Sequence, residues 1–187
     1  LRKEFPEAAL HVETSTFKLF GISESAVDAA MADADLAGLG VGIGFYPNFP
    51  ENHIVLTARS AAASEAAERL RRADALVEAR LRKYIFARGD ETPEKIVAGL
   101  LTERHLTLAV AESCTGGLIT DRLTDVPGSS AFLERGVVTY SNAAKTSLLG
   151  VPEAVIQEHG AVSAETARLM AEGVRRLAAT DLGIAVT

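Results

Sequence analysis

The sequence lacks tryptophan, and its aromatic side chains are limited to seven phenylalanines and three tyrosines. It has a single cysteine, Cys114, which excludes an internal disulfide and favours a reducing, cytoplasmic compartment. No apolar run approaches the roughly 18 residues of a membrane span, and no signal-peptide pattern opens the chain, so we expect no membrane partner. The 187 residues suffice for one large domain or two small ones, with cores built mainly from Ala, Leu, Val and Ile. Because the chain begins at Leu1 rather than Met, we expect it to be a piece of a longer protein.

Positive charge is also scarce, since the formal net charge is −6. Residues 1–89 carry 11 basic and 12 acidic side chains, whereas residues 90–187 carry 8 basic and 13 acidic ones. An acidic chain lacks the basic footprint that nucleic acids require, so we expect no nucleic-acid partner. Net charge does not decide a local pocket, and a small phosphorylated ligand held by backbone groups is compatible with this composition.

The clearest boundary in the sequence is the segment 87–93 (ARGDETP). It follows a long helical pattern and ends in a helix-start signal, with Thr92 as N-cap and Pro93 at the first helical position. We therefore predict two independent domains, residues 1–88 and residues 93–187.

The first domain has the pattern of a small α+β unit. Periodicity and turn signals predict strands at 11–20, 41–46 and 53–58 and helices at 23–31 and 64–84. Many arginines lie on the last helix, but acidic side chains balance them, so we interpret its polar face as a solvated surface. The glycine-rich segment GVGIG is followed by no strong helix start, which favours a strand entry over a dinucleotide-binding loop.

The second domain alternates helices with strands, which is typical of an α/β fold with a mostly parallel sheet and helices on both faces. We expect strands at 106–110, 136–140 and 182–187, and helices at 93–104, 115–124, 142–149, 152–159 and 163–178. These strands are almost continuously apolar, which predicts burial on both faces. Ligands bind beyond the carboxyl ends of such strands, and functional residues are expected there.

The first of these strand ends runs into AESCTGG, with Ser113 at the start of a sharp turn and Gly116 and Gly117 at its end. Such a turn directs several backbone N–H groups and the positive end of the following helix at one point, which suits a phosphate or an oxyanion. A serine at its edge is a candidate nucleophile. The simpler alternative is that Ser113 or Thr115 only caps the helix and the glycines serve packing.

A serine hydroxyl needs a base to take its proton, and no histidine follows a strand end at this edge. Lys145 follows the second strand, in the first turn of its helix, where the helix dipole and burial would both lower its pKa. An ordinary exposed lysine is the alternative. Cys114 is a rival nucleophile, interpreted as a small buried residue, and Glu112 is either a rival acid or a cap for backbone amides in the turn. The sequence contains no metal-ligand cluster.

These same residues carry a family resemblance. The order and spacing of AESCTGG, DVPGSS and GVVTYSNxAK over residues 93–187 resemble the C-terminal domain of the CinA family, whose stand-alone members are nicotinamide-nucleotide amidases. Residues 1–88 resemble, without a sharp motif, the small middle domain of full-length CinA proteins, which is often called KH-like.

The resemblance implies a serine/lysine amidohydrolase without metal or cofactor, acting on nicotinamide mononucleotide. It implies Ser113 as the nucleophile and Lys145 as the base, with Tyr140, Ser130 and Thr187 lining the site. The turn residues Thr115, Gly116 and Gly117 are expected to bind the substrate through amides that donate to the oxyanion. A homo-oligomer is expected.

Two departures from the family pattern concern the ends of the chain. The family continues past Thr187 with a glycine-rich segment and a later substrate-holding arginine, so we expect the domain to be truncated at its C-terminal end. Full-length relatives also begin with a nucleotide-hydrolysing domain. The alternative function is a non-catalytic module that binds nucleotides or partner proteins, and retention of both Ser113 and Lys145 favours the enzyme.

Overall fold

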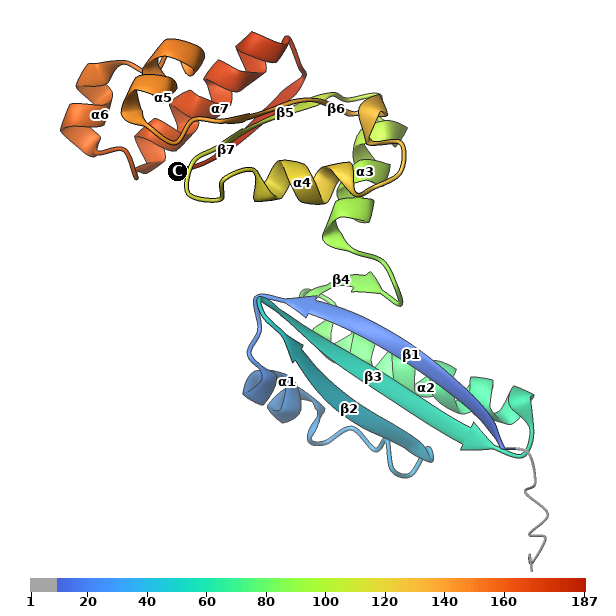
Figure 1. Ribbon diagram of the computed structural model, residues 1–187. Coiled ribbons are helices and arrows are strands. Elements are labelled where there is room, and N and C mark those ends of the chain that lie inside the picture. Colours follow the sequence, from blue (N-terminus) through green and yellow to red (C-terminus); the bar gives the residue numbers. More distant parts are fainter. Residues whose placement is uncertain (1–9) are drawn as a thin grey trace, which may run out of the picture. The chain divides into compact units, whose positions relative to one another are not determined.

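The computed structural model describes residues 10–187, which divide into two compact units between Pro93 and Glu94 (Figure 1). The division lies at the end of the segment that the sequence marks as a boundary. Whether the two units fold independently stays a prediction.

The first unit contains one antiparallel sheet, with strands in the order β2-β3-β1-β4. Its strands are β1 (His11–Phe20), β2 (Val41–Asn48), β3 (Glu51–Ser60) and β4 (Ile85–Arg88). The three strands predicted from alternation are confirmed, and the glycine-rich segment lies in one of them, β2. The four-residue strand β4 was not predicted: the predicted helix ended at residue 84, and the last two residues of β4 were assigned to the boundary segment 87–93.

Two helices, α1 (Glu24–Met31) and α2 (Ala63–Leu81), pack on the sheet and provide most of the remaining residues of the first core (Figure 1). Buried positions recur at three- and four-residue steps along α2, as expected for an amphipathic helix. Alternate residues of β1, Phe17 and Leu19, are fully buried against this layer. The other helix begins at an N-cap, Ser23, whose hydroxyl accepts a hydrogen bond from the Ala26 N–H.

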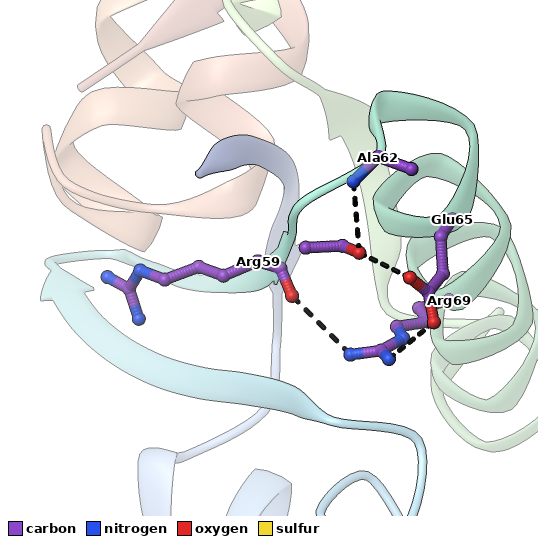
Figure 2. A network of polar contacts seen from close by, with 5 residues as sticks. Arg59, Ala62, Glu65 and Arg69 are labelled. Atoms are coloured by element: carbon purple, nitrogen blue, oxygen red, sulfur yellow. Dashed lines mark hydrogen bonds and ion pairs between the residues drawn. The ribbon is translucent and has the colours of Figure 1, made fainter. Parts of the chain in front are cut away.

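The charged face of α2 is a solvated, ion-paired surface, as predicted. Arg69 pairs with Glu65 at 2.6 Å, and Arg71 pairs with Glu68 at 2.7 Å. Figure 2 shows how the first of these pairs joins the helix start to the end of β3, because Arg69 also donates to the Arg59 carbonyl at 3.4 Å. These two arginines pair with glutamates of their own helix, as expected for a solvated charged face.

The second unit contains a three-stranded parallel sheet in the order β6-β5-β7. Its strands are β5 (Leu108–Glu112), β6 (Leu133–Val138) and β7 (Leu182–Val186). The helices are α3 (Pro93–Glu103), α4 (Leu118–Thr124), α5 (Asn142–Leu149), α6 (Glu153–His159) and α7 (Ala164–Ala178), and a short 3-10 helix, η1, covers Ser129–Ala131.

Helices lie on both faces of this sheet, which confirms the predicted fold class. On the central strand β5, Leu108 and Val110 belong to one core with residues of α3 and α4, while Ala109 and Ala111 belong to another with residues of α5, α6 and α7. Successive side chains of a strand point to opposite faces, so the two cores are separated by the sheet.

The two outer strands differ from the expectation that every strand is buried on both faces. Most residues of β6 are exposed, Val138 among them. In β7, Leu182 and Ile184 are exposed, although they pair with the buried Leu108 and Val110 of the central strand. The helix α7 packs so closely on the other face that a Cβ at Gly183 would lie 2.3 Å from the Ala171 carbonyl oxygen. Continuous apolar character predicted the strand correctly but overestimated its burial.

The segment Gly89–Thr92 connects β4 to α3, and its residues Gly89, Asp90 and Glu91 are exposed. Arg88, by contrast, lies within β4, donates to Asp74 and Glu78, and stacks over the Phe17 ring at 4.2 Å.

We therefore predict that a glutamate-specific protease cuts first after Glu91, faster than trypsin cuts after Arg88, and releases two fragments that resist further digestion. Mass spectrometry of the early fragments measures the order of cleavage. A first cut inside either unit, for example after Glu158 in α6, would contradict independent folding of the two units.

Candidate active site

Three strand ends meet at the carboxyl edge of the parallel sheet. The Ser113 N–H donates to the Val186 carbonyl at 2.9 Å, and the Thr139 N–H donates to the Glu112 carbonyl at 2.7 Å. These two bonds extend the hydrogen-bond ladder one step beyond the strands themselves. Ser113 is thereby held between the ends of β6 and β7, at the place where parallel sheets bind ligands.

The side chain of Lys145 reaches this point from α5. Ser141 caps that helix by accepting a hydrogen bond from the Ala144 N–H at 3.1 Å, which places Lys145 in the first turn. The Lys145 Nζ lies 2.9 Å from Ser113 Oγ, and the two residues are 1% and 7% exposed. The predicted proximity of the two side chains is confirmed, and their catalytic role stays a prediction.

Two backbone carbonyls fix the orientation of the lysine amine. Nζ lies 2.9 Å from the Thr139 oxygen and 3.2 Å from the Tyr140 oxygen. Carbonyl oxygens only accept hydrogen bonds, so a neutral amine directs its two N–H bonds at them. Its lone pair then faces the remaining neighbour, the Ser113 hydroxyl, which is able to donate. In its neutral form the amine is therefore placed to accept a proton from this hydroxyl.

Burial lowers the pKa of Lys145 below its ordinary value, because the ammonium form loses its hydration. The neighbouring Cys114 acts in the opposite direction, since a thiolate there would favour a positive lysine. The Cys114 side chain is a free, exposed thiol rather than the small buried residue that the sequence suggested. Burial is the larger of the two effects, so the net shift of the Lys145 pKa is downward, toward the neutral form.

Glu112 is the last residue of β5, lies on the face of that strand that packs against α3 and α4, and is fully buried. Its carboxylate accepts hydrogen bonds from the backbone of Gly117, Ile119 and Thr120 at 2.8–3.1 Å, and from the Thr120 hydroxyl at 2.7 Å. Of the two roles that the sequence left open for Glu112, rival acid or amide cap, the structure supports the cap.

Burial by itself would raise the pKa of Glu112, but these donors outweigh it and lower the pKa to about 2. The Thr115 hydroxyl also favours the ionised carboxylate, although this contact falls short of hydrogen-bond geometry. The buried Thr115 oxygen has no hydrogen-bond partner in the described part of the chain.

The turn between β5 and α4 depends on its two glycines. Gly116 and Gly117 have φ values of 63° and 107°, in the left-handed region where other residues are strained. Because of this turn, the helix begins at Leu118, three residues later than the predicted Thr115.

The turn's amides are already partly used. The Gly116 N–H donates to the Ser113 carbonyl at 3.1 Å, and the Gly117 N–H donates to Glu112. Among the described residues, the N–H groups of Cys114 and Thr115 make no such bond. Of the expected donors Thr115, Gly116 and Gly117, the two glycine amides are therefore engaged within the turn, and only the Thr115 N–H stays available. The Cys114 N–H, which was not among the expected donors, is available beside it.

The remaining predicted site residues are placed less closely. Thr187 follows β7 at the same sheet edge, and its hydroxyl donates to the Ala161 carbonyl at 2.7 Å. Tyr140 contributes its carbonyl to Lys145, whereas its side chain is 76% exposed, and no hydrogen bond in residues 10–187 joins its hydroxyl to the pair. Ser130 lies in η1, just before β6 begins, whereas Ser113 follows the end of β5. Within one chain, the structure does not bring Ser130 to the serine–lysine pair.

One contributor was missed by the sequence analysis as a site residue. Thr139 is fully buried, accepts from Lys145 through its carbonyl, and has a hydroxyl without a partner among the described residues. Carbonyl ligands leave no mark on side-chain patterns, so only its position three residues before the helix could have indicated it.

Residues 10–187 contain no group of three or more His, Cys, Asp or Glu side chains placed to hold a metal ion. None of their helices is both long enough and apolar enough to cross a membrane.

A parallel α/β unit with a buried serine–lysine pair at its strand ends, following a small antiparallel α+β unit, defines the class of this protein. Residues 90–187 match the CinA C-terminal domain, and residues 14–87 match the damage-inducible protein CinA KH domain. The chain therefore belongs to the CinA family.

Individual relatives agree with this assignment. A CinA-like protein of Syntrophus aciditrophicus is 67% identical over 176 residues, which cover 94% of this chain and 42% of that protein. A CinA-like protein of Geobacter sulfurreducens is 46% identical over 186 residues, which cover 100% of this chain and 44% of that protein. The chain thus spans less than half the length of these curated relatives.

A solved structure, the competence damage-inducible protein A (ComA) of Klebsiella pneumoniae, matches with 38% identity and a TM-score of 0.50. The match covers 50% of this chain and 58% of that one. It is consistent with the α/β fold class described above.

The lowered pKa of Glu112 predicts a specific loss of stability in acid. A carboxylate that titrates at about 2 when folded and near its ordinary value when unfolded stabilises the fold above about pH 4.5. That contribution, about 3 kcal/mol, is lost as the pH falls from about 4.5 to 2. Glu112→Gln removes the titration and should flatten this pH dependence. Hydrogen exchange of peptides from residues 94–187 measures the free energy of unfolding, and parallel curves for the two proteins would contradict the prediction.

Proposed function

We propose that this chain carries a serine/lysine amidohydrolase that converts nicotinamide mononucleotide to nicotinic acid mononucleotide and ammonia. The observation that supports it most directly is the 2.9 Å contact between Lys145 Nζ and Ser113 Oγ in a buried position. The substrate follows from the resemblance of AESCTGG, DVPGSS and GVVTYSNxAK to the amidases of the family.

The first half of the proposed reaction forms an acyl-enzyme. The neutral amine of Lys145 takes the Ser113 proton as Oγ bonds to the carboxamide carbon. The amides of Cys114 and Thr115 donate to the oxygen that becomes negative. The Lys145 proton then passes to the leaving nitrogen, the carbon–nitrogen bond breaks, and ammonia departs.

The second half uses water in the place of ammonia. Lys145, neutral again after the first half, takes a proton from water as the water oxygen attacks the acyl carbon. The ester bond to Ser113 breaks as Lys145 passes that proton to Oγ, and the acid product loses its remaining proton to solvent and leaves as a carboxylate. The same two side chains therefore serve both halves, and the chemistry requires no other side chain to change protonation state.

The buried lysine favours an enzyme over a module that only binds nucleotides or partners. Burying an amine away from water and away from any carboxylate costs free energy, because its charged form is destabilised. A surface that only binds nucleotides or partners gains nothing from a buried lysine with a lowered pKa. A lysine that binds phosphate works best when it is charged and accessible. A base that must accept a proton near neutral pH requires the lowered pKa.

We predict that Ser113→Ala and Lys145→Ala each remove nearly all amidase activity in the protein at its full natural length. Lys145→Arg should not restore it, since a guanidinium does not act as a base near neutral pH. The double variant should be little worse than either single variant, because the pair works as one unit. Ammonia release from nicotinamide mononucleotide measures the rate, and equilibrium binding should fall far less than kcat.

The matched control is Cys114→Ala, one residue from the nucleophile, which keeps the backbone N–H and should retain turnover. Loss of activity in Cys114→Ala with retention in Ser113→Ala would show that the neighbouring side chain is the nucleophile. Tyr140→Phe should be milder than the changes at Ser113 and Lys145, costing at most roughly 10²–10⁴-fold if its hydroxyl transfers a proton.

The pH profile provides a separate prediction. Because Lys145 acts as its neutral form, kcat/KM should rise with pH and level off above the lowered pKa of this lysine. Removing the group that raises this pKa, in Cys114→Ala, should move the rising limb to lower pH. Steady-state rates between about pH 5 and 10 test the direction of both effects. A limb that moves to higher pH, or its absence, would contradict Lys145 as the base.

A further inference from the structure

The first turn of α4 already contains an anion of its own. The N-terminus of a helix exposes N–H groups that attract negative charge, and the sequence alone suggested a phosphate or an oxyanion there. In the structure the carboxylate of Glu112 occupies that position, on the face of β5 that packs against α3 and α4. The proposed reaction uses Glu112 neither as acid nor as base, so its burial needs another reason.

Both oxygens of this carboxylate are fully engaged. Oε2 accepts from the Gly117 and Ile119 N–H groups at 3.0 and 3.1 Å, and Oε1 accepts from Thr120 twice, at 2.8 and 2.7 Å. All four partners donate, so a proton on the carboxyl group would displace one of them. The arrangement therefore requires the ionised form, and a glutamine, with one amide nitrogen that only donates, cannot reproduce it.

We propose that Glu112 is the positioning residue of the site, whose carboxylate clamps the start of α4 and so holds the Cys114 and Thr115 N–H groups toward the carbonyl oxygen of the substrate. The inference rests on the proposed amidase function for the identity of that carbonyl. It adds a role that the serine–lysine pair does not supply.

The clamp acts through the backbone of a single short turn. Residue 112 ends β5, residues 113–117 form the turn, and the Glu112 side chain closes the ring by binding the amide of residue 117. The glycines at 116 and 117 allow the sharp reversal but also leave the turn free to adopt other conformations. A fixed anion at one end of the turn removes that freedom, and donors held in place before reaction are the ones that stabilise an oxyanion well.

The Glu112 carboxylate is also the anion that occupies the positive end of the α4 helix dipole. Since Glu112 neutralises it, the phosphate of the substrate is expected to bind elsewhere, and the oxyanion is stabilised by two directed N–H groups rather than by the helix dipole. Loss of the carboxylate should therefore slow the chemical step more than it weakens substrate binding.

The test compares Glu112→Gln with Asp181→Asn in the protein at its full natural length. Asp181 is a matched control because its carboxylate also accepts from a backbone amide and a threonine hydroxyl, both of Thr107 at 2.8 Å, but at the opposite end of the sheet. We expect Glu112→Gln to lower kcat roughly 10- to 10²-fold with little change in KM, and Asp181→Asn to leave both near wild type.

A second readout does not depend on the natural substrate. A fluorophosphonate reacts with an activated serine, forming an Oγ–P bond, releasing fluoride and passing the hydroxyl proton to the base, and its P=O oxygen needs the same N–H donors. Labelling of Ser113 should be slower in Glu112→Gln than in wild type and unchanged in Asp181→Asn. Thr120→Val, which removes one donor and retains the carboxylate, should lie between wild type and Glu112→Gln and keeps the test decisive if Glu112→Gln does not fold.

Wild-type labelling rates in both Glu112→Gln and Thr120→Val would overturn the proposal, as would equal slowing in Asp181→Asn, which would indicate a general loss of stability. A wild-type protein that is not labelled at Ser113 would overturn it as well. Labelling at Ser113 without release of ammonia from nicotinamide mononucleotide would contradict the proposed substrate alone, because the labelling rates still decide the role of Glu112.

Discussion

The rest of the site depends on the burial of one amine. Lys145 is 1% exposed, and its nitrogen contacts two carbonyl oxygens and one hydroxyl oxygen, none of them charged. Water would keep this amine protonated at neutral pH, so the surrounding fold must exclude it. The closely packed helices of the second unit contribute to this, because Leu149 of α5 and Val174 of α7 share one buried core with Ala111 of β5.

Glycines set how closely those helices pack. A Cβ at Gly173 in α7 would lie 2.2 Å from the Leu149 carbonyl oxygen at the end of α5, and one at Gly183 in β7 would meet α7 itself. These contacts require hydrogen at both positions, so the glycines maintain the separation of α5, α7 and the sheet. They contribute to the site without touching it, and their effect passes through the position of the helix that carries Lys145.

Much of this could be predicted from the sequence, and the reasons for the remainder are physical. Periodic segments such as His11–Phe20 and Asn142–Leu149 were predicted with their observed bounds. Because functional residues gather beyond the carboxyl ends of parallel strands, the sequence also predicted that Ser113 and Lys145 lie close together. Two kinds of information were absent from the pattern. Carbonyl contacts, such as those of Thr139 and Tyr140, involve atoms that every residue has. The strand β5 ends at Glu112 rather than at Val110, because backbone pairing with both neighbours, not apolar character, decides where a buried strand stops.

The two ionisable groups at this strand end show how environment assigns charge. Glu112 and Lys145 are both buried, and desolvation opposes the charged form of each. Around Glu112, three amides and a hydroxyl supply donors from a helix N-terminus, enough to keep the carboxylate ionised. Around Lys145 there is no carboxylate among the hydrogen-bond partners, and burial prevails. One strand end thus holds a carboxylate kept ionised by backbone donors on one face and, on the other, an amine whose pKa is lowered by burial.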